Sequence, residues 1–367
     1  MIMKVAFRVD ASLQIGSGHV MRCLTLADAL CASGAQCLFV CRPHLGHLIQ
    51  QILKKHSCVA LSIVADGSEQ TCQFEPPSYS SWLGCSWESD ASQTCDVLRD
   101  FQPDWLIVDH YALDSRWEQR VQSVCGKICV IDDLADRSHS CTLLLDQNLG
   151  RSRADYTGLV SAECITMIGP RFALLRDEFV AARQLSLERR SSGLVESLLV
   201  TLGGVDVNNA TVTVLRALGR SALSHQCAVT VVLGQQNTWY EQVIDVAAEL
   251  PFQTQVLINS SEMAALMAGA DLAIGAAGAT SWERSCLGLP TVLLALAANQ
   301  IPSAVALQDA GAALYIGGAE CIEVMLPIAI ERLLDTSALQ AMSSAASSIC
   351  DGLGVQRVID QLRRATS

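Results

Sequence analysis

The chain has 367 residues, of which 50% are hydrophobic and 17% are charged, and its formal net charge is −12. This length exceeds one typical domain of about 100 to 200 residues, so two domains are expected. The negative charge argues against a general role in binding nucleic acids or membrane surfaces, because such binding needs clustered Lys and Arg to neutralise phosphates.

The apolar residues are spread over many short runs, and none approaches the roughly 20 apolar residues that span a bilayer. Residues 1–5 lead directly into a predicted strand without a secretory signal pattern, which predicts a cytoplasmic location. The 16 cysteines include no CxxC pair, and Cys37 with Cys41 and Cys125 with Cys129 lie in or beside apolar runs. We therefore expect buried free thiols rather than disulfides or a metal site.

The first half of the chain alternates between strand-like and helix-like runs. Strands are predicted at 4–9, 36–40, 59–64, 105–109, 127–132 and 141–145, and helices at 20–31, 47–55, 91–100 and 115–124. The strands are apolar on both faces, which predicts a parallel sheet covered by helices on both sides. A polar stretch at 67–92 interrupts this pattern and is predicted to be a loop that could close over a substrate.

A second series follows a charged, helix-prone segment. It contains strands at 197–202, 228–233, 254–258, 272–275 and 291–294, and helices at 211–218, 241–250, 261–268 and 280–286. The predicted fold is α/β, with two doubly wound Rossmann-like domains that face a central cleft and bind ligands at the carboxyl ends of their strands. The predicted domains cover 1–170 and 194–345, with an interdomain connection at 171–193 and a C-terminal helical segment at 346–367.

The turn after the first strand carries the first candidate site. Gly16 and Gly18 allow the backbone to approach a ligand closely, and the helix that follows favours negative charge at its start. His19 in this turn can exchange a proton near neutral pH, although such a histidine is more often a cap or a structural residue. Either Asp10 or Arg8, on the preceding strand, is expected to orient the imidazole, and Asp10 is the better candidate.

Two turns of the second series have a similar character. Gly203 and Gly204 follow a strand and indicate either a phosphate-binding turn or an ordinary tight connection. The segment 275–283 again places glycines at a strand end, and its polar residues either cap the helix or bind phosphate and ribose. Three glycine turns at strand ends favour a nucleotide ligand.

Acidic side chains follow two strands of the first half, at 109–111 and 132–136. Their polar groups are expected to point toward the same cleft as His19. Aspartate pairs are also common in turns and caps, and no histidine is spaced to complete a metal site here.

These motifs together resemble a family, the hydrolases that release UDP from UDP-2,4-diacetamido-2,4,6-trideoxy-β-L-altropyranose in pseudaminic acid biosynthesis. The resemblance covers most of the chain, and the order of its short motifs is specific. The motifs are 8–12 (RVDAS), 15–23 (IGSGHVMRC), 109–111 (DHY), 131–137 (IDDLADR), 144–148 (LLDQN), 173–179 (ALLRDEF), 203–206 (GGVD), 275–283 (GAAGATSWE), 288–290 (GLP) and 299–300 (NQ).

The resemblance implies a glycosyltransferase B type fold, similar to the enzyme that adds N-acetylglucosamine to the peptidoglycan lipid precursor. His19 would be the general base that activates water, which attacks the anomeric carbon with C–O cleavage and inversion. A monomer acting on a small UDP-sugar, without metal or cofactor, is expected. Its catalytic residues are expected to be His19 and Asp10; its substrate-binding residues Gly16, Gly18, Arg22, Tyr111 and Arg176; and its UDP-binding residues Gly203, Gly204, Gly278, Thr280, Ser281, Glu283, Asn299 and Gln300.

Two alternatives remain open at this point. A UDP-sugar glycosyltransferase of the same fold would use His19 to activate an acceptor hydroxyl, although no basic amphipathic patch for a lipid-linked acceptor is evident. A non-catalytic nucleotide-sugar binding protein would keep the glycine turns and not need the base. The chain is also longer than a minimal member of the family, around 64–92 and after 299.

Overall fold

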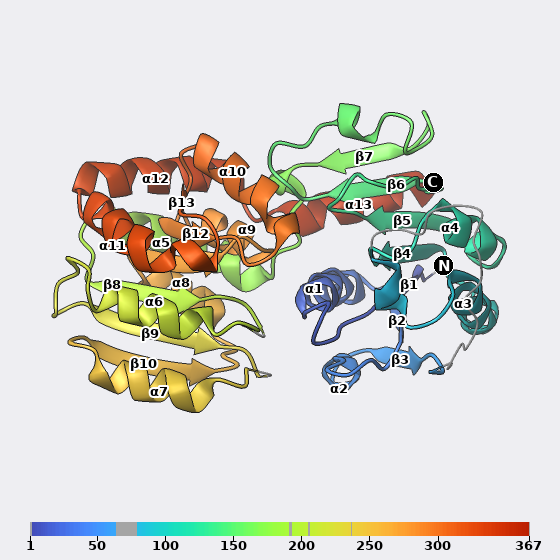
Figure 1. Cartoon of the computed structure of the whole chain (residues 1–367). Helices are drawn as coiled ribbons and strands as arrows, with labels where there is room; N and C mark the ends of the chain where they lie inside the picture. Colours follow the sequence, from blue (N-terminus) through green and yellow to red (C-terminus); the bar gives the residue numbers. More distant parts are fainter. Residues whose placement is uncertain (1, 64–78, 191–192, 205, 236, 367) are drawn as a thin grey trace. The chain divides into compact units, whose positions relative to one another are not determined.

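The computed structural model describes residues 2–63, 79–190, 193–204, 206–235 and 237–366, which form two compact units (Figure 1). The first unit comprises Met1–Leu174 and Gly354–Ser367, and the second comprises Leu175–Leu353. The chain thus leaves the first unit once and returns to it with its last helix. No helix in the described ranges is both long and apolar enough to cross a membrane.

The first unit is built on a seven-stranded parallel sheet with the order β3-β2-β1-β4-β5-β6-β7. Its strands are β1 Lys4–Val9, β2 Gln36–Cys41, β3 Ser57–Ala60, β4 Trp105–Asp109, β5 Lys127–Ile131, β6 Leu143–Asp146 and β7 Ile165–Ile168. Its helices are α1 Gly18–Ala32, α2 Ile49–Ile52, α3 Trp87–Phe101, α4 Ser115–Val121 and α13 Gly354–Thr366. The central strands are apolar on both faces, as a sheet covered by helices requires.

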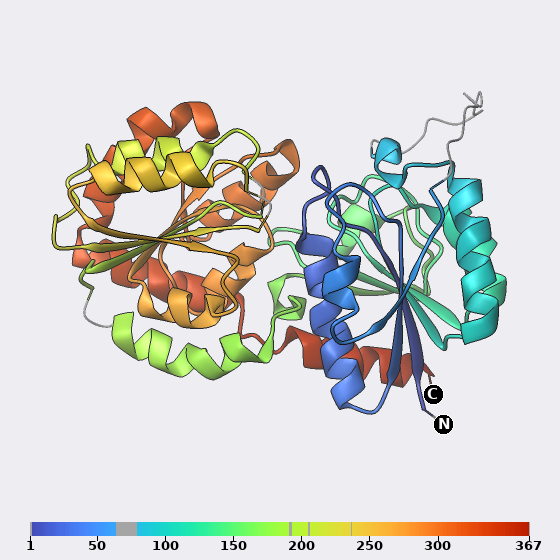
Figure 2. The same cartoon turned by 90° about the horizontal axis from the view of Figure 1, so that it is seen from below.

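Each face of this sheet has its own helices. Alternate residues of β1 and β4, including Val5, Phe7 and Ile107, pack with α1 and α13, whereas Leu106 and Val108 pack with α3 and α4. Figure 2 shows α1 and α13 on one side of the sheet and α3 on the other. Because side chains alternate along a strand, the position of a residue in β1 or β4 decides which helices it faces.

The second unit repeats this architecture with the strand order β10-β9-β8-β11-β12-β13, again all parallel. Its strands are β8 Ser197–Thr201, β9 Ala228–Leu233, β10 Gln253–Ile258, β11 Leu272–Ala276, β12 Thr291–Leu294 and β13 Leu314–Tyr315. Its helices are α5 Asp177–Arg189, α6 Ala210–Leu218, α7 Tyr240–Glu249, α8 Met263–Gly269, α9 Thr280–Cys286, α10 Ile301–Asp309, α11 Ile322–Leu333 and α12 Thr336–Ile349. The prediction of two doubly wound α/β domains is confirmed.

Strand order reverses once in each sheet, between β1 and β4 in the first unit and between β8 and β11 in the second. In open α/β sheets, ligands bind beyond the carboxyl ends of the strands at such a reversal. The predicted turns at 16–19 and 203–204 follow β1 and β8, and the predicted segment 275–283 starts with the last two residues of β11, so each lies beside a reversal point.

Several local predictions differ from the structure. The strand predicted at 59–64 is β3 at Ser57–Ala60, and the helix predicted at 47–55 is the single turn α2. Of the predicted loop at 67–92, residues up to 78 lie outside the described residues, 80–83 form a 3₁₀ turn, and α3 starts at Trp87. Ser86 caps α3 by accepting a hydrogen bond from the Ser89 amide at 3.2 Å, a start signal within the polar stretch. The described cysteines are free thiols.

Candidate active site

His19 lies at the start of α1, and Asp109 at the end of β4 holds its imidazole. The Nδ1 atom is 2.6 Å from Oδ1 of Asp109, and the His19 side chain is 10% exposed. Burial alone would raise the pKa of Asp109, but Arg22 and His19 hold it well below its usual range. Because an ionised aspartate can only accept, the neutral imidazole carries its proton on Nδ1 and keeps a lone pair on Nε2.

Arg22, one turn further along α1, links two carboxylates. Its Nε and Nη2 donate to Oδ2 and Oδ1 of Asp109 at 2.7 and 2.6 Å, and its Nη1 is 2.8 Å from Oδ2 of Asp133. Arg22 and Tyr111, two of the predicted substrate-binding residues, therefore lie close to His19. The donors of Arg22 point to protein carboxylates, and its role toward a substrate stays a prediction.

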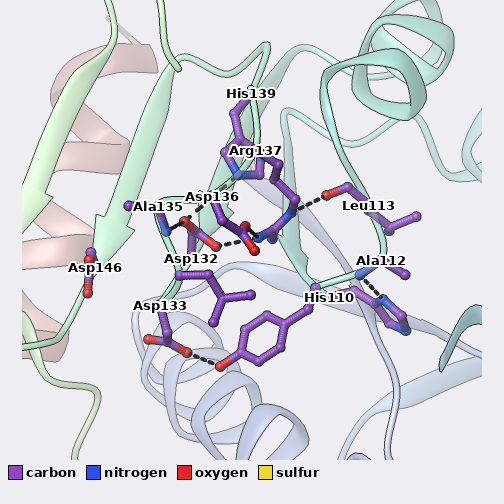
Figure 3. A network of polar contacts seen from close by, with 12 residues as sticks. His110, Ala112, Leu113, Asp132, Asp133, Ala135, Asp136, Arg137, His139 and Asp146 are labelled. Atoms are coloured by element: carbon purple, nitrogen blue, oxygen red, sulfur yellow. Dashed lines mark hydrogen bonds and ion pairs between the residues drawn. The ribbon is translucent and has the colours of Figure 1, made fainter. Parts of the chain in front are cut away.

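Tyr111 closes the site on another side. Its hydroxyl donates to Oδ2 of Asp133 at 2.8 Å, the contact drawn at Asp133 in Figure 3. Burial and the adjacent Asp133 raise the pKa of Tyr111, so the hydroxyl keeps the proton that it donates. The ring meets His19 edge-on, with centroids 4.6 Å apart, and Trp82 and Tyr79 pack against it at 5.8 and 5.3 Å. These two aromatic residues lie where the sequence predicted only a loop.

Asp10 does not have the predicted orienting role, because Asp109 takes its place at Nδ1. Asp10 accepts two hydrogen bonds from Arg8, at 2.7 and 2.9 Å, and one from the Arg42 amide at 2.6 Å. The physical reason is strand alternation: Asp10 and Arg8 point toward α3, where Arg8 also contacts Asp90, whereas α1 covers the opposite face.

His110 joins the cluster of charged residues formed by Asp10, Arg8 and Asp90. Its Nδ1 accepts a hydrogen bond from the Ala112 amide at 3.1 Å, as Figure 3 shows, and its Nε2 lies 3.3 Å from Oδ2 of Asp10. Burial lowers the pKa of His110, which favours a neutral ring with its proton on Nε2. Asp10 and His110 therefore tie the ends of β1 and β4 together on the face away from His19.

The acidic segment after β5 divides between the same two faces. Asp132 pairs with Arg137 at 2.8 Å and accepts a hydrogen bond from the Ala135 amide, whereas Asp133 turns toward Tyr111 (Figure 3). Asp146 is the last residue of β6. Burial and the nearby charge of Asp133 raise the pKa of Asp146 to about 7. Within the described ranges, no group of three or more His, Cys, Asp or Glu is arranged to hold a metal ion.

In the second unit, the predicted UDP-binding hydroxyls of Thr280 and Ser281 share a buried cation. Arg284 donates to Thr280 Oγ1 and Ser281 Oγ, each at 3.1 Å, and to the Ala276 carbonyl at 2.8 Å. A Cβ at Gly275 would lie 2.4 Å from Nη1 of Arg284, so a larger residue there would displace the guanidinium. Because arginine has no acceptor, both hydroxyl protons remain available for a ligand.

Glu283, the predicted ribose-binding residue, lies one turn further along α9. Burial raises the pKa of Glu283 to about 7. The positive charge of Arg176, whose Nη2 lies 3.7 Å from Oε1 of Glu283, acts in the opposite direction. Arg176 also pairs with Glu178 at 3.0 Å, so this predicted substrate-binding residue belongs to the Glu283 cluster of the second unit.

The other predicted UDP-binding residues lie in nearby connections of the second unit. Gly278 and Gly203 have open space where a side chain would stand, and Gly203 has a positive φ of +103°. Gly204 approaches the turn after β9 closely, since a Cβ at Gly234 would lie 1.9 Å from its carbonyl oxygen. Asn299 and Gln300 form a 3₁₀ turn after β12, where Gln300 Oε1 accepts a hydrogen bond from the Leu296 amide at 2.9 Å.

The structure therefore forms two candidate sets. His19, Arg22 and Tyr111 gather in the first unit beside the Gly16 and Gly18 turn. The second set, in the second unit, consists of Gly278, Thr280, Ser281, Glu283 and Arg176. Sequence patterns missed the contacts of Asp109 with His19 and of Asp133 with Arg22. The signal available was alternation along β4, which puts Asp109 on the same face as Ile107 but does not show which helix covers that face.

Most of the second unit, together with the start of α13, matches a known family model. Residues 197–362 match the Glycosyltransferase family 28 C-terminal domain. An uncharacterized protein of Methanocaldococcus jannaschii is 23% identical over 296 residues, which cover 80% of this chain and 55% of that protein. A UDP-2,4-diacetamido-2,4,6-trideoxy-beta-L-altropyranose hydrolase of Campylobacter jejuni is 28% identical over 222 residues, 60% of this chain and 68% of the hydrolase. The match to the archaeal protein thus spans about half of that protein's length.

Solved structures agree on the fold. MurG of Acinetobacter baumannii superposes with a TM-score of 0.72 and 15% identity, over 99% of both chains. This chain accordingly has the glycosyltransferase B fold, and its residues 197–362 are similar to the C-terminal domain of glycosyltransferase family 28.

Proposed function

We propose that the protein is a hydrolase that releases UDP from UDP-2,4-diacetamido-2,4,6-trideoxy-β-L-altropyranose. The observation that carries the proposal is the 2.6 Å contact between His19 Nδ1 and Asp109, which leaves Nε2 able to accept a proton. The motif resemblance and the similarity to the Campylobacter jejuni hydrolase support this substrate.

In the proposed reaction, His19 removes a proton from water. The water oxygen forms a bond to the anomeric carbon, and the bond from that carbon to the diphosphate oxygen breaks, so the electron pair leaves with UDP. The proton passes to Nε2 of His19, and Asp109 stabilises the imidazolium. Attack from the side opposite to UDP inverts the configuration of the anomeric carbon.

The second unit is proposed to bind the leaving group. Thr280 and Ser281 would donate their hydroxyl protons to diphosphate oxygens, while Arg284 holds both hydroxyl oxygens from behind. Glu283 would accept hydrogen bonds from the ribose hydroxyls. Gly203, Gly204, Asn299 and Gln300 are proposed to line the same ligand.

The experiment that tests this function is incubation with the UDP-diacetamido sugar in the presence of EDTA and without an acceptor. Rapid release of UDP, with NMR showing a free sugar of inverted configuration, is the expected result. UDP release only without EDTA would contradict the metal-independent mechanism. Binding of the UDP-sugar without release would contradict the hydrolase proposal.

A UDP-sugar glycosyltransferase is the second candidate. It is favoured by the match of residues 197–362 to the C-terminal domain of glycosyltransferase family 28. In that case Nε2 of His19 would take the proton of an acceptor hydroxyl, and UDP release would require the acceptor. A protein that only binds the nucleotide-sugar would release no UDP under either condition.

We expect UDP affinity to rise about tenfold between pH 6 and pH 8, because an ionised Glu283 accepts ribose hydroxyls better than a protonated one. With a pKa of about 7, the ionised fraction of Glu283 rises about tenfold over this range. Calorimetric titration with UDP, and with uridine to remove phosphate titration, measures the effect.

The variant Glu283→Gln is expected to bind more weakly and to lose this pH dependence. Glu178→Gln is the matched control, because it removes the other carboxylate that pairs with Arg176. An unchanged pH profile in Glu283→Gln would show that Glu283 does not bind the ribose in its ionised form.

A further inference from the structure

We propose that Asp133 is a positioning residue for His19, acting through Arg22 and Tyr111 to keep the lone pair of the imidazole on Nε2. This inference rests on the proposed role of His19 as the base. Five side chains form a closed ring of contacts in which His19 touches Asp109, Asp109 binds Arg22, Arg22 binds Asp133, Asp133 binds Tyr111, and Tyr111 packs on His19.

The first path from Asp133 to His19 runs through Arg22. Asp133 Oδ2 lies 2.8 Å from Nη1 of Arg22, so one end of the guanidinium is fixed. The other end, Nε and Nη2, then donates to both oxygens of Asp109 at 2.7 and 2.6 Å. Asp133 thereby sets the direction in which the Asp109 carboxylate meets the imidazole.

This path also controls the tautomer, because Nη2 of Arg22 lies only 3.3 Å from Nδ1 of His19. If the guanidinium turned and donated to Nδ1, that nitrogen would need a lone pair, and the imidazole proton would move to Nε2. A ring protonated at Nε2 cannot accept a proton from water there. By holding Nη1, Asp133 keeps Nη2 on Asp109 and the ring in the form with a free Nε2.

The second path runs through Tyr111. Its hydroxyl donates to the same Oδ2 of Asp133 at 2.8 Å, and its ring meets the His19 ring at an interplanar angle of 84°. Arg137 covers the Tyr111 ring at 5.8 Å and Trp82 stacks on it at 5.8 Å, so the ring is fixed on several sides. One carboxylate oxygen thus contacts both Arg22, which binds Asp109, and Tyr111, which packs on the imidazole.

Asp133 differs from the adjacent Asp132 in its exposure and in its partners. Asp132 is fully buried and binds Arg137, whereas the Asp133 side chain is 17% exposed. Within the part of the chain that the structure describes, the hydrogen bonds and ion pairs of the Asp133 carboxylate go to Arg22 and Tyr111 only. Because Asp133 is partly exposed and binds Arg22 and Tyr111, we infer that it orients these two side chains and contributes little to the packing of the core. We therefore expect its loss to impair turnover much more than folding.

The test compares Asp133→Ala and Asp133→Asn with wild type by long-range ¹H–¹⁵N NMR of the imidazoles at pH 8.5, above the usual titration range of histidine. The His19 signals are identified with His19→Ala. We expect the Nδ1–H form in wild type, a mixture with the Nε2–H form in Asp133→Ala, and an intermediate result in Asp133→Asn. Asp136→Asn, which removes an outer partner of Arg137, is the control and should match wild type.

Turnover provides the second measurement. The kcat for acceptor-free UDP release is expected to fall about 10- to 100-fold in Asp133→Ala, as is usual for residues that orient a functional group, with KM changed less than about twofold. Tyr111→Phe, which cuts one path only, should show a smaller loss of kcat and unchanged ring tautomers.

The outcomes separate the two proposals. An unchanged tautomer in both Asp133 variants would overturn the positioning role, whether or not the enzyme turns over. Absence of UDP release by wild type would refute the hydrolase function, while the NMR comparison would still test Asp133. Should Asp133→Ala fail to fold, Asp133→Asn keeps a side chain of the same shape and decides the question.

Discussion

Replacing His19 with Ala is expected to slow acceptor-free UDP release by about 10² to 10⁴-fold, the range that general base catalysis contributes. The only proton acceptor that we assign to the attacking water is Nε2 of His19, and alanine removes it together with the imidazolium that Asp109 would stabilise. UDP binding by calorimetry should stay within about twofold of wild type, since the proposed UDP contacts lie on other side chains.

His225→Ala is a suitable control because this histidine is exposed in the second unit. It should release UDP at the wild-type rate. Near-normal turnover by His19→Ala would show that another group activates the water and would remove the central residue from the mechanism.

Asp90→Ala is expected to destabilise the first unit by about 3 to 5 kcal/mol, the usual cost of breaking a buried ion pair by removing one partner. Asp90 is fully buried on α3 and accepts hydrogen bonds from Arg8 at 3.1 and 2.7 Å, from Arg42 at 2.7 Å and from the Trp117 indole at 3.0 Å. Its loss leaves two buried guanidinium groups short of one carboxylate.

Amide hydrogen exchange of β1 and α3 measures this loss for the first unit alone, which matters because a two-unit protein need not unfold in one step. Asp96→Ala is the matched control on the same helix: Asp96 is 69% exposed and pairs only with Arg99 among the ion pairs of the described residues. Its change should stay within about 0.5 kcal/mol. Equal protection in both variants would show that the cluster around Asp90 does not stabilise this unit.

Periodicity and turn chemistry predicted the fold well. Short strands that are apolar on both faces alternate with helical patterns, and this is enough to indicate two parallel sheets covered by helices. The glycine turns after β1, β8 and β11 also placed the candidate sites at strand ends. The boundaries of β3 and α2 were less accurate, because short elements without strong caps depend on their neighbours.

The partner of His19 could not be predicted in the same way. Asp10 is nine residues from His19 along the chain, yet it points to the face covered by α3, whereas Asp109 is 90 residues away and points to the face covered by α1. Alternation shows which strand residues share a face, but it does not show which helix covers that face. For the same reason the adjacent residues Asp132 and Asp133 have different roles. Asp132 forms a buried ion pair with Arg137, whereas Asp133 belongs to the ring of contacts around His19.

The sequence by itself determined the two α/β units and the glycine turns at their strand ends, because these depend on patterns of a few neighbouring residues. The resemblance to a known family added His19 as the candidate base. Only the tertiary structure decided that Asp109 holds the imidazole, that Asp133 closes the ring through Arg22 and Tyr111, and that α13 returns to pack on the first sheet. These contacts join residues tens to hundreds of positions apart. They follow from strand order and from which helices cover each face, which no local pattern records.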